Sequence, residues 1–278
     1  MPDKPATAAG YAPEQVELVQ QVCLYVATKL GDLMQELVVI GGLVPSLIIN
    51  QEDLPEGAGR HVGTMDLDVG LSLAVLDQQL YTEICRRLRA AEFEMDENQD
   101  GNPTRQRWKI TQSGGVTIDF LIPPSLKSDR GGRIRNIEKD FAAVIVPGLE
   151  LAFEDRVMVP LQGTTIMGEA ATREIQVCGP GAFLVLKALA FKYRGENKDA
   201  YDLFYVVRNF GDGIPDVVSH LRPLLESAEA QEALELLRQY FLDPDGLGPM
   251  RAAEFITGGP DEEIQADIMG FVRQLLQR

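Results

Sequence analysis

Hydrophobic and polar positions along the chain follow two periods, and the period changes near residue 180. Short apolar or alternating runs predict strands at 37–40, from Asp66 onward, and three times within 93–122, with further strands at 156–161 and 173–177. Beyond residue 180, apolar positions recur at helical spacing to the end of the chain. We therefore expect an α+β protein, with an α/β lobe over residues 1–178 and a helical lobe over 179–278.

The first lobe also contains two patterns of apolar residues at helical spacing. One spans residues 13–36 and predicts a long amphipathic helix; the other follows the Asp66 strand. Between Gln51 and Gly63 the chain is rich in proline, glycine and acidic residues, which predicts an inserted polar loop. His61 lies in this loop, and we expect it to be solvated.

Composition limits the kind of protein this can be. The chain has 278 residues, of which 45% are hydrophobic, so it can bury a sizeable core in one or two domains. It has no apolar run of about 18 residues, and residues 1–10 lack a signal-peptide core, so we expect a cytoplasmic protein without a membrane span. Three scattered cysteines, Cys23, Cys85 and Cys178, are typical of reduced packing residues.

The charge of the chain bears on its partners. A net charge of −16 argues against a broad nucleic-acid-binding surface, because phosphate neutralisation dominates such affinity. Charge can be uneven, however, and basic residues cluster at 86–89, 105–109 and 127–135. RNA therefore stays open as a partner. With only two histidines, a histidine zinc site or a Ser-His-Asp triad is not expected.

The strongest chemical signal is a set of three carboxylates in strand patterns. Asp66 and Asp68 are two residues apart and therefore share one strand face, while Leu67 lies on the other. Asp119 lies in the apolar run 116–122, on the face opposite its core side chains. If the two strands are neighbours, the carboxylates converge. Such a set suits Mg²⁺, and two Mg²⁺ ions can clamp the reacting oxygens in phosphoryl transfer.

The alternative is that these carboxylates are solvated surface charges. Asp-x-Asp is common by chance, and a second copy at Asp243 and Asp245 lies in a turn rich in proline and glycine. Asp119 favours the metal site, because a carboxylate within an apolar strand is costly unless it is paired or bound to a metal.

The order of motifs resembles that of a known family. Gly41-Gly42, Asp66-Leu67-Asp68 and Asp119 occur in the order found in the DNA polymerase β superfamily of nucleotidyltransferases. The stretches 187–194 and 198–203 are similar to the helical signature of AbiEii-type nucleotidyltransferases, the toxins of type IV toxin–antitoxin systems. The resemblance covers roughly residues 37–210. It implies a polymerase β-like lobe with a mixed sheet, followed by a C-terminal helical lobe that completes the active-site cleft.

The resemblance also implies roles for individual residues. It implies that Asp66 and Asp68 bind two Mg²⁺ ions and that Asp119 binds one of them. Asp119 could also help to deprotonate an attacking hydroxyl. The triphosphate would contact Gly41 and Gly42, with Lys187 neutralising phosphate and Lys192 or Arg194 assisting. The later carboxylate of the family corresponds to Asp199 or Asp202. The serine that often follows the family's glycine turn has its nearest counterpart here in Ser46, beyond Pro45.

Ion pairing is the alternative for the helical residues. Lys187 and Arg194 are seven apart on one predicted helix, and Asp199 and Asp202 are three apart on the next. Each pair therefore shares a face, and salt bridges between the two helices explain Asp202 as well as catalysis does, but explain Lys187 less well.

The expected function is transfer of a nucleoside monophosphate from a nucleoside triphosphate to an acceptor hydroxyl. On family grounds the acceptor is RNA, such as a tRNA 3′ end, or a protein, and a cognate antitoxin is an expected type of partner. Two alternatives remain. A small-molecule transferase of the aminoglycoside-modifying kind suits an acidic protein, and a non-catalytic member would bind only a nucleotide or a partner protein.

Overall fold

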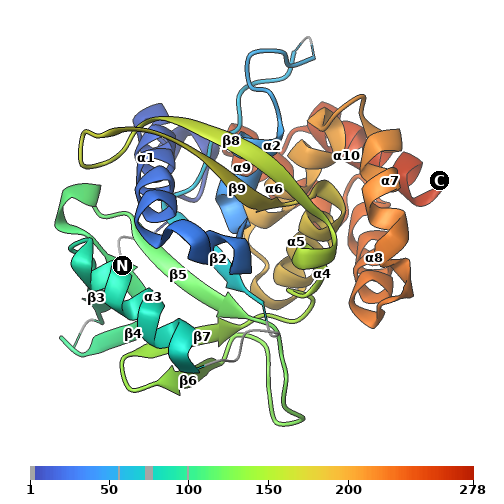
Figure 1. The fold of residues 1–278 in the computed structure, drawn as a ribbon. Coiled ribbons are helices and arrows are strands. Elements are labelled where there is room, and N and C mark those ends of the chain that lie inside the picture. Colours follow the sequence, from blue (N-terminus) through green and yellow to red (C-terminus); the bar gives the residue numbers. More distant parts are fainter. Residues whose placement is uncertain (1–3, 56, 73–77, 99) are drawn as a thin grey trace. The chain divides into compact units, whose positions relative to one another are not determined.

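The chain forms two compact units in the computed structural model, which describes residues 4–55, 57–72, 78–98 and 100–278 (Figure 1). The sheet unit comprises described residues 13–44 and 63–178, and the helical unit comprises 4–12, 45–62 and 179–278. The helical unit is therefore discontinuous in sequence, because two segments from the first quarter of the chain belong to it.

The sheet unit is built on a mixed sheet, as expected. Its main path has the strand order β3-β4-β5-β2-β1-β9-β8, and β7 pairs with both β5 and β6. Parallel pairs join β2 to β5, β1 to β9 and β5 to β7, and the other pairs are antiparallel. The strands are β1 (Leu37–Ile40), β2 (Asp66–Leu71), β3 (Glu94–Glu97), β4 (Pro103–Lys109), β5 (Thr117–Ile122), β6 (Ile134–Glu138), β7 (Phe141–Ile145), β8 (Arg156–Thr164) and β9 (Ala170–Cys178).

The helices α1 (Pro13–Leu30) and α3 (Gln78–Ala90) pack on this sheet. Helix α1 packs on β2, β8 and β9, and α3 packs on β6 and β7 (Figure 1). The predicted helix over 13–36 is too long, because the chain continues from 31 to 36 as a 3₁₀ helix. Gly31 explains the change: its φ of +58° is the left-handed conformation with which α-helices commonly end. A short helix, α4 (Leu151–Glu154), precedes β8.

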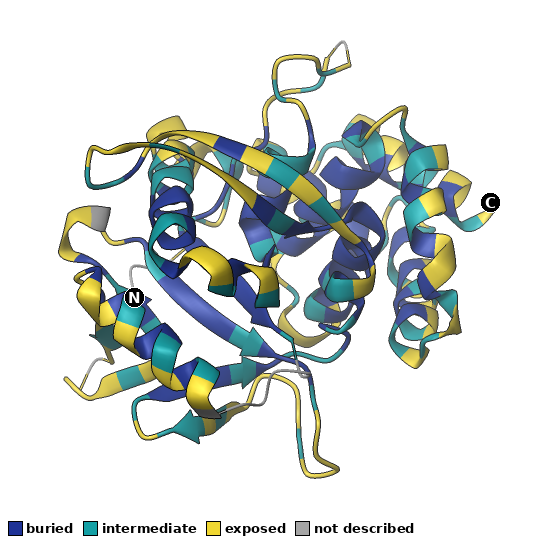
Figure 2. Ribbon diagram, viewed as in Figure 1, coloured by how far each residue is buried: buried dark blue, intermediate teal, exposed yellow. Residues whose placement is uncertain are grey.

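The alternation predicted for β2 and β5 is present in the structure. Leu67, Val69, Ile118 and Phe120 are at most 1% exposed and form the core face, and β2 and β5 run through the buried part of the unit (Figure 2). The other face carries the carboxylates of Asp66, Asp68 and Asp119. The three cysteines are free and buried, in agreement with a packing role.

The helical unit contains the helical pattern predicted beyond residue 180. Its long helices are α5 (Pro180–Arg194), α6 (Asn197–Asn209), α7 (Ile214–Leu221), α8 (Ala228–Phe241), α9 (Leu247–Thr257) and α10 (Glu262–Leu276). Helix α5 packs against α6, α7 and α8, and α6 packs against α9 and α10. No helix in the described part of the chain is long and apolar enough to cross a bilayer.

The segment 45–62 attaches to helix α6 within the helical unit. It begins in the short helix α2 (Val44–Ile48) and continues without further strands or helices in its described residues. The Tyr205 hydroxyl lies 3.1 Å from both Gln51 Oε1 and the Gly59 carbonyl oxygen, and its hydrogen can be donated to either. The polar loop predicted here is therefore tied to the helix by side chains that lie far along the sequence.

Candidate functional site

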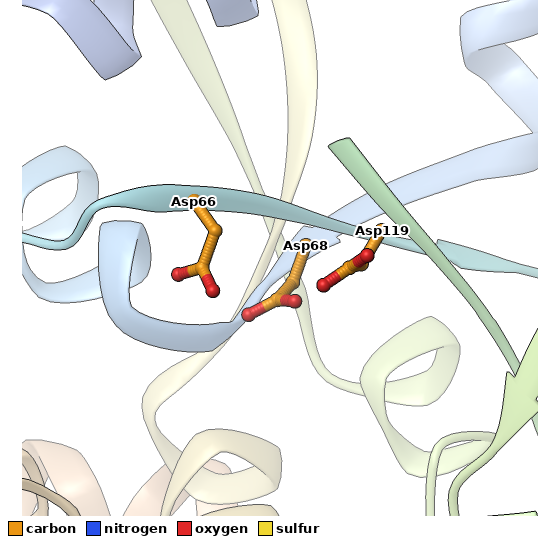
Figure 3. Close-up of side chains that lie close together, drawn as sticks. All are labelled: Asp66, Asp68 and Asp119. Carbon is orange, nitrogen blue, oxygen red and sulfur yellow. The ribbon is translucent and has the colours of Figure 1, made fainter. Parts of the chain in front are cut away.

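Three carboxylates come together on the polar face of β2 and β5 (Figure 3). The two strands are parallel neighbours, and Asp68 lies directly opposite Asp119 in the register. Asp66 is two residues earlier on β2, so its side chain shares the face of Asp68. One carboxylate oxygen from each residue lies within 4.8 Å of the others. The predicted convergence of these side chains is confirmed.

This donor set is suitable for a hard divalent cation. Asp66 and Asp119 are each 8% exposed, and Asp68 is half-buried. The Thr64 hydroxyl donates to Asp66 Oδ1 at 2.7 Å, which fixes the orientation of that carboxylate. Carboxylate oxygens are preferred by Mg²⁺ and Ca²⁺, whose metal–oxygen distances of about 2.0–2.6 Å allow one ion to bridge oxygens about 4–5 Å apart. The three residues could therefore hold a metal ion.

Gly41 lies against this site. It follows β1 directly, and Ile40, the last residue of β1, is paired with Asp68. The φ of Gly41 is +75°, and a Cβ added there would collide with the Asp68 carboxylate. Gly42 is buried in the same 3₁₀ turn, over residues 41–43, and helix α2 follows. The predicted strand–glycine turn–helix is thus present, and Gly41 is needed for its conformation and for its lack of a side chain.

Arg107 completes this face of the sheet, although no motif in the sequence points to it. It lies on β4 directly opposite Asp119. Its Nε donates to Asp119 Oδ1 at 2.7 Å and its Nη2 donates to Asp119 Oδ2 at 2.5 Å. Burial alone would lower the pKa of Arg107, but the hydrogen bonds and charge of Asp119, with the charges of Asp66 and Asp68, raise it overall. The only signal in the sequence was the basic cluster 105–109.

A second group of charges is buried within the helical unit. Lys187 Nζ, on α5, lies 2.9 Å from Asp199 Oδ1 and 2.7 Å from Asp202 Oδ2, both on α6. Arg194 Nη2 lies 2.8 Å from Asp199 Oδ1, and Lys198 Nζ lies 2.7 Å from Asp202 Oδ1. The salt bridges between the two helices, which the sequence offered as the alternative to a catalytic role, are therefore present.

The charges in this network hold one another in the ionised state. Burial opposes the charge of Lys187, but Asp199 and Asp202 raise its pKa well above the ordinary value. Burial likewise opposes the charge of Asp202, but Lys187 and Lys198 hold the pKa of that carboxyl far below its ordinary value. Burial lowers the pKa of Lys198, against the opposing charge of Asp202.

His61 belongs to the same network, so the prediction of a solvated loop histidine is wrong. It is 5% exposed, and its ring is stacked on that of Tyr201 and edge-on to that of Tyr205. Its Nε2 lies 2.9 Å from Asp202 Oδ1. Because an ionised carboxylate only accepts, Nε2 carries the proton and donates to Asp202. The polar composition of the loop predicted that this side chain would be exposed to solvent, but residues of α6 bury its ring.

Ser46, His61 and Asp202 form a hydrogen-bonded chain. The Ser46 Oγ lies 3.2 Å from His61 Nδ1, which in this tautomer accepts a hydrogen bond from the Ser46 hydroxyl. The order is that of a Ser-His-Asp triad, but the charges do not favour nucleophile activation. Burial lowers the pKa of His61 to about 4, aided by the charges of Lys198 and Lys187, so the ring is a weak base near neutrality. Ser46 is therefore a hydrogen-bond partner of the buried His61 ring and not an activated nucleophile.

The remaining predicted residue, Lys192, lies elsewhere on helix α5. Its Nζ is 2.5 Å from Glu232 Oε1 in an exposed ion pair, so it does not join the buried network. The carboxylates of the sheet unit and the charges of the helical unit are thus each assembled within their own unit. In comparisons with known proteins, no family model matches the chain and no curated protein matches its sequence.

Proposed function

We propose that the chain is a Mg²⁺-dependent nucleotidyltransferase that moves a nucleoside monophosphate from a nucleoside triphosphate to an acceptor hydroxyl. The observation that supports it most is the convergence of Asp66, Asp68 and Asp119 on one strand face, with oxygens within 4.8 Å. The Gly41 turn is the second support, because its missing Cβ lets the backbone of the turn lie directly against the Asp68 carboxylate. The order of these residues also resembles AbiEii-type nucleotidyltransferases.

The residues of the chain have distinct tasks in this proposal. Asp66 and Asp68 hold a divalent cation, with Thr64 keeping Asp66 in place. A bound Mg²⁺ supplies charge neutralisation at the phosphate oxygens. The backbone of Gly41 can approach a phosphate group closely, since no Cβ intervenes. In such reactions most of the rate enhancement comes from positioning and electrostatic stabilisation, so few side chains are needed.

The transfer itself exchanges one phosphorus–oxygen bond for another. The acceptor hydroxyl oxygen forms a bond to the α-phosphorus, the bond from the α-phosphorus to the bridging oxygen breaks, and pyrophosphate leaves. The hydroxyl proton passes to water or to a carboxylate oxygen. Asp119, expected to help with this proton, has both oxygens engaged by Arg107, which makes it a poor acceptor. We assign the proton to water.

Lys187 is proposed to bind anionic phosphate from the helical unit. The resemblance supports this proposal, because it implies that Lys187 neutralises phosphate. The acceptor proposed from the resemblance is RNA or a protein hydroxyl. The net charge of −16 favours the small-molecule alternative, since an acidic protein attracts a cationic acceptor such as an aminoglycoside.

The test is label transfer from each of four α-³²P-labelled nucleoside triphosphates, with Mg²⁺, into total RNA, protein and aminoglycosides. We expect label in one fraction, and Asp66→Asn should reduce it about a hundredfold or more, because metal charge stabilisation is worth several kcal/mol. The matched control is Asp245→Asn in the other Asp-x-Asp, which is exposed on the helical unit and should leave transfer unchanged. Absence of transfer, or transfer that survives Asp66→Asn, would contradict the proposal.

A further inference from the structure

The basic loop, residues 123–135, joins β5 to β6 and includes the first two residues of β6. It carries four cations and one carboxylate, a net charge of +3 in a chain whose total is −16. The loop extends beyond the end of β5 (Figure 1), and most of its residues are exposed (Figure 2). An anion that approaches this acidic protein therefore meets a local field of attractive sign here.

The other two basic clusters are largely neutralised by carboxylates. In the cluster at 86–89 all three arginines pair with a carboxylate, and in the cluster at 105–109 two of the three cations do. In the basic loop only Arg135 has such a partner among the residues that the structure describes. Three cations of the loop therefore remain available to a binding partner: Lys127, Arg130 and Arg133.

Internal contacts hold the basic loop in shape. Asp129 Oδ2 accepts hydrogen bonds from two backbone N–H groups and pairs with Arg135. Arg130 Nη1 donates to the backbone carbonyls of Lys127 and Asp129, at 3.2 and 2.8 Å. Backbone hydrogen bonds tie the end of the loop to Ile145 on β7. Because the loop is already ordered, binding a partner costs it little conformational entropy.

The basic loop begins close to the carboxylates along the chain. Strand β5 ends at Ile122, three residues after Asp119, which is about 10 Å at the rise of a strand. The loop and the three carboxylates belong to the same unit. Successive phosphates of a stacked nucleic-acid strand are about 3.4 Å apart along its axis. A strand whose terminal hydroxyl lies at the carboxylates can therefore bring phosphates a few nucleotides away to the loop.

We infer that the basic loop binds the phosphodiester backbone of an RNA acceptor through Lys127, Arg130 and Arg133. This inference rests on the proposed function, because the transfer reaction is the reason for a strand end to lie at the carboxylates. It selects RNA from the possible acceptors. The positive charge of the loop attracts phosphate, whereas it repels a cationic acceptor such as an aminoglycoside.

An anionic lipid surface matches the basic loop less well than RNA does. Leu126 and Ile134, at the two ends of the cationic stretch, are 60% and 52% exposed, as in many segments that lie on a membrane. A bilayer is broad, however, so its negative surface would also face the carboxylates of the surrounding acidic chain. A single RNA strand is narrow and can contact the loop alone.

The test is binding of a short fluorescein-labelled single-stranded RNA to the full chain, by fluorescence anisotropy between about 50 and 200 mM salt. Three phosphate contacts predict a slope of about −2 for the logarithm of the association constant against the logarithm of the salt concentration. The triple variant Lys127→Gln, Arg130→Gln, Arg133→Gln should lose most of this slope. It should also bind at least about tenfold more weakly at the lowest salt.

Two control variants separate local charge from net charge and from folding. The first removes three cations at scattered exposed positions and should keep the slope: Arg173→Gln, Arg222→Gln and Arg273→Gln. The second keeps all three charges of the loop while it changes the side chains: Lys127→Arg, Arg130→Lys and Arg133→Lys. It should also keep the slope, because counterion release depends on charge and not on the shape of the cation.

Several results would overturn the inference. These are the absence of RNA binding, equal loss of slope in the two glutamine variants, or loss of slope in the variant that keeps the charges. Binding to vesicles of phosphatidylserine and phosphatidylcholine, with no binding to RNA, would also overturn it and would assign the basic loop to a membrane surface.

The failure of this inference is distinguishable from that of the proposed function. RNA binding that depends on the basic loop, without label transfer, would keep the binding surface and remove the reaction. Label transfer into RNA that the triple glutamine variant performs as well as the unaltered protein would keep the reaction and remove the surface. Label in aminoglycosides alone would keep the reaction and overturn the choice of RNA.

Discussion

At the scale of single residues, Gly41 meets two requirements of its position that no other amino acid would meet. Its φ of +75° is unfavourable for a side chain, and its missing Cβ leaves room for the Asp68 carboxylate. Gly41→Ala should therefore lower the free energy of unfolding by about 1–2 kcal/mol from the backbone alone, with overlap adding to this. It should also weaken Mn²⁺ binding, because Asp68 must move. Urea unfolding and metal titration measure the two effects.

Gly270 provides the matched control for this substitution. It lies in helix α10, and a Cβ added there would meet no atom within 4 Å. Gly270→Ala should therefore stabilise the protein by about 0.5–1 kcal/mol, since alanine is the better helix former. A Gly41→Ala protein as stable as Gly270→Ala would show that the turn does not depend on glycine.

His61 should make the stability of the protein depend on pH in a defined window. Its pKa is about 4 in the folded protein, against about 6.5 in an unfolded chain. Between these values the unfolded state binds a proton that the folded state does not, so the free energy of unfolding rises with pH from about 4 to 6.5. At about 1.36 kcal/mol per pKa unit, the rise is up to about 3 kcal/mol.

Urea unfolding between pH 4 and 7 tests this dependence. His61→Gln should flatten the curve in this window, because glutamine does not titrate, whatever its effect on stability at pH 7. His220→Gln, at the other histidine, is the control and should keep the slope. The depressed pKa of Asp202 adds a loss of stability only as the pH falls below about 4, outside the window. Parallel curves for the unaltered protein and His61→Gln would contradict the prediction.

At the scale of secondary structure, the junction of α5 and α6 depends on Lys187. Removing this buried cation leaves Asp199 and Asp202 short of a partner. Lys187→Met should therefore cost about 3–5 kcal/mol of unfolding free energy. Lys192→Met, five residues along the same helix, removes only an exposed pair with Glu232 and should cost less than about 1 kcal/mol.

Denaturant unfolding of both variants measures the difference. Adding Asp202→Asn to Lys187→Met should recover part of the loss, since it removes a charge left without its partner. If Lys187→Met costs no more than Lys192→Met, the buried network does not stabilise this junction.

Strand periodicity predicts the carboxylate face because it is a local property. Leu67 and Ile118 bury on one side, so Asp66, Asp68 and Asp119 must share the other once β2 and β5 pair. Arg107 does not follow from such a pattern. Its partnership with Asp119 spans 12 residues and depends on the register that the intervening turn imposes. The sequence shows a basic cluster around residue 107, but it does not show which residue Arg107 contacts in the folded protein.

His61 shows the same limit more strongly. Proline, glycine and acidic residues around it predict an exposed loop, and the segment does lack strands and helices between Gln51 and His61 where the structure describes it. Its burial depends on Tyr201, Tyr205 and Asp202. No window of neighbouring residues contains that information, so sequence reasoning predicts the segment but not the burial of its histidine.

At the scale of the whole molecule, the helical unit is incomplete without a segment from early in the chain. Residues 179–278 alone lack His61 and Gln51, which contact Asp202 and Tyr205. We expect this fragment to have helical far-ultraviolet circular dichroism but a melting temperature below that of the full chain. A synthetic peptide of residues 45–62 should raise it, and the same peptide with His61→Ala should raise it less.

Thermal melts of the fragment with each peptide test this expectation. A fragment that melts as the full chain does, or that responds equally to both peptides, would show that the segment contributes little to the unit.

The discontinuity of the helical unit also has a consequence for protein synthesis. His61 and Asp202 are 141 residues apart, so a ribosome adding about 5–20 residues per second needs about 7–28 s between them. During this time β1 and β2 can already pair on either side of the segment 45–62, closing it into a loop. The loop must then wait, with His61 uncovered, until Tyr201, Asp202 and Tyr205 have been made.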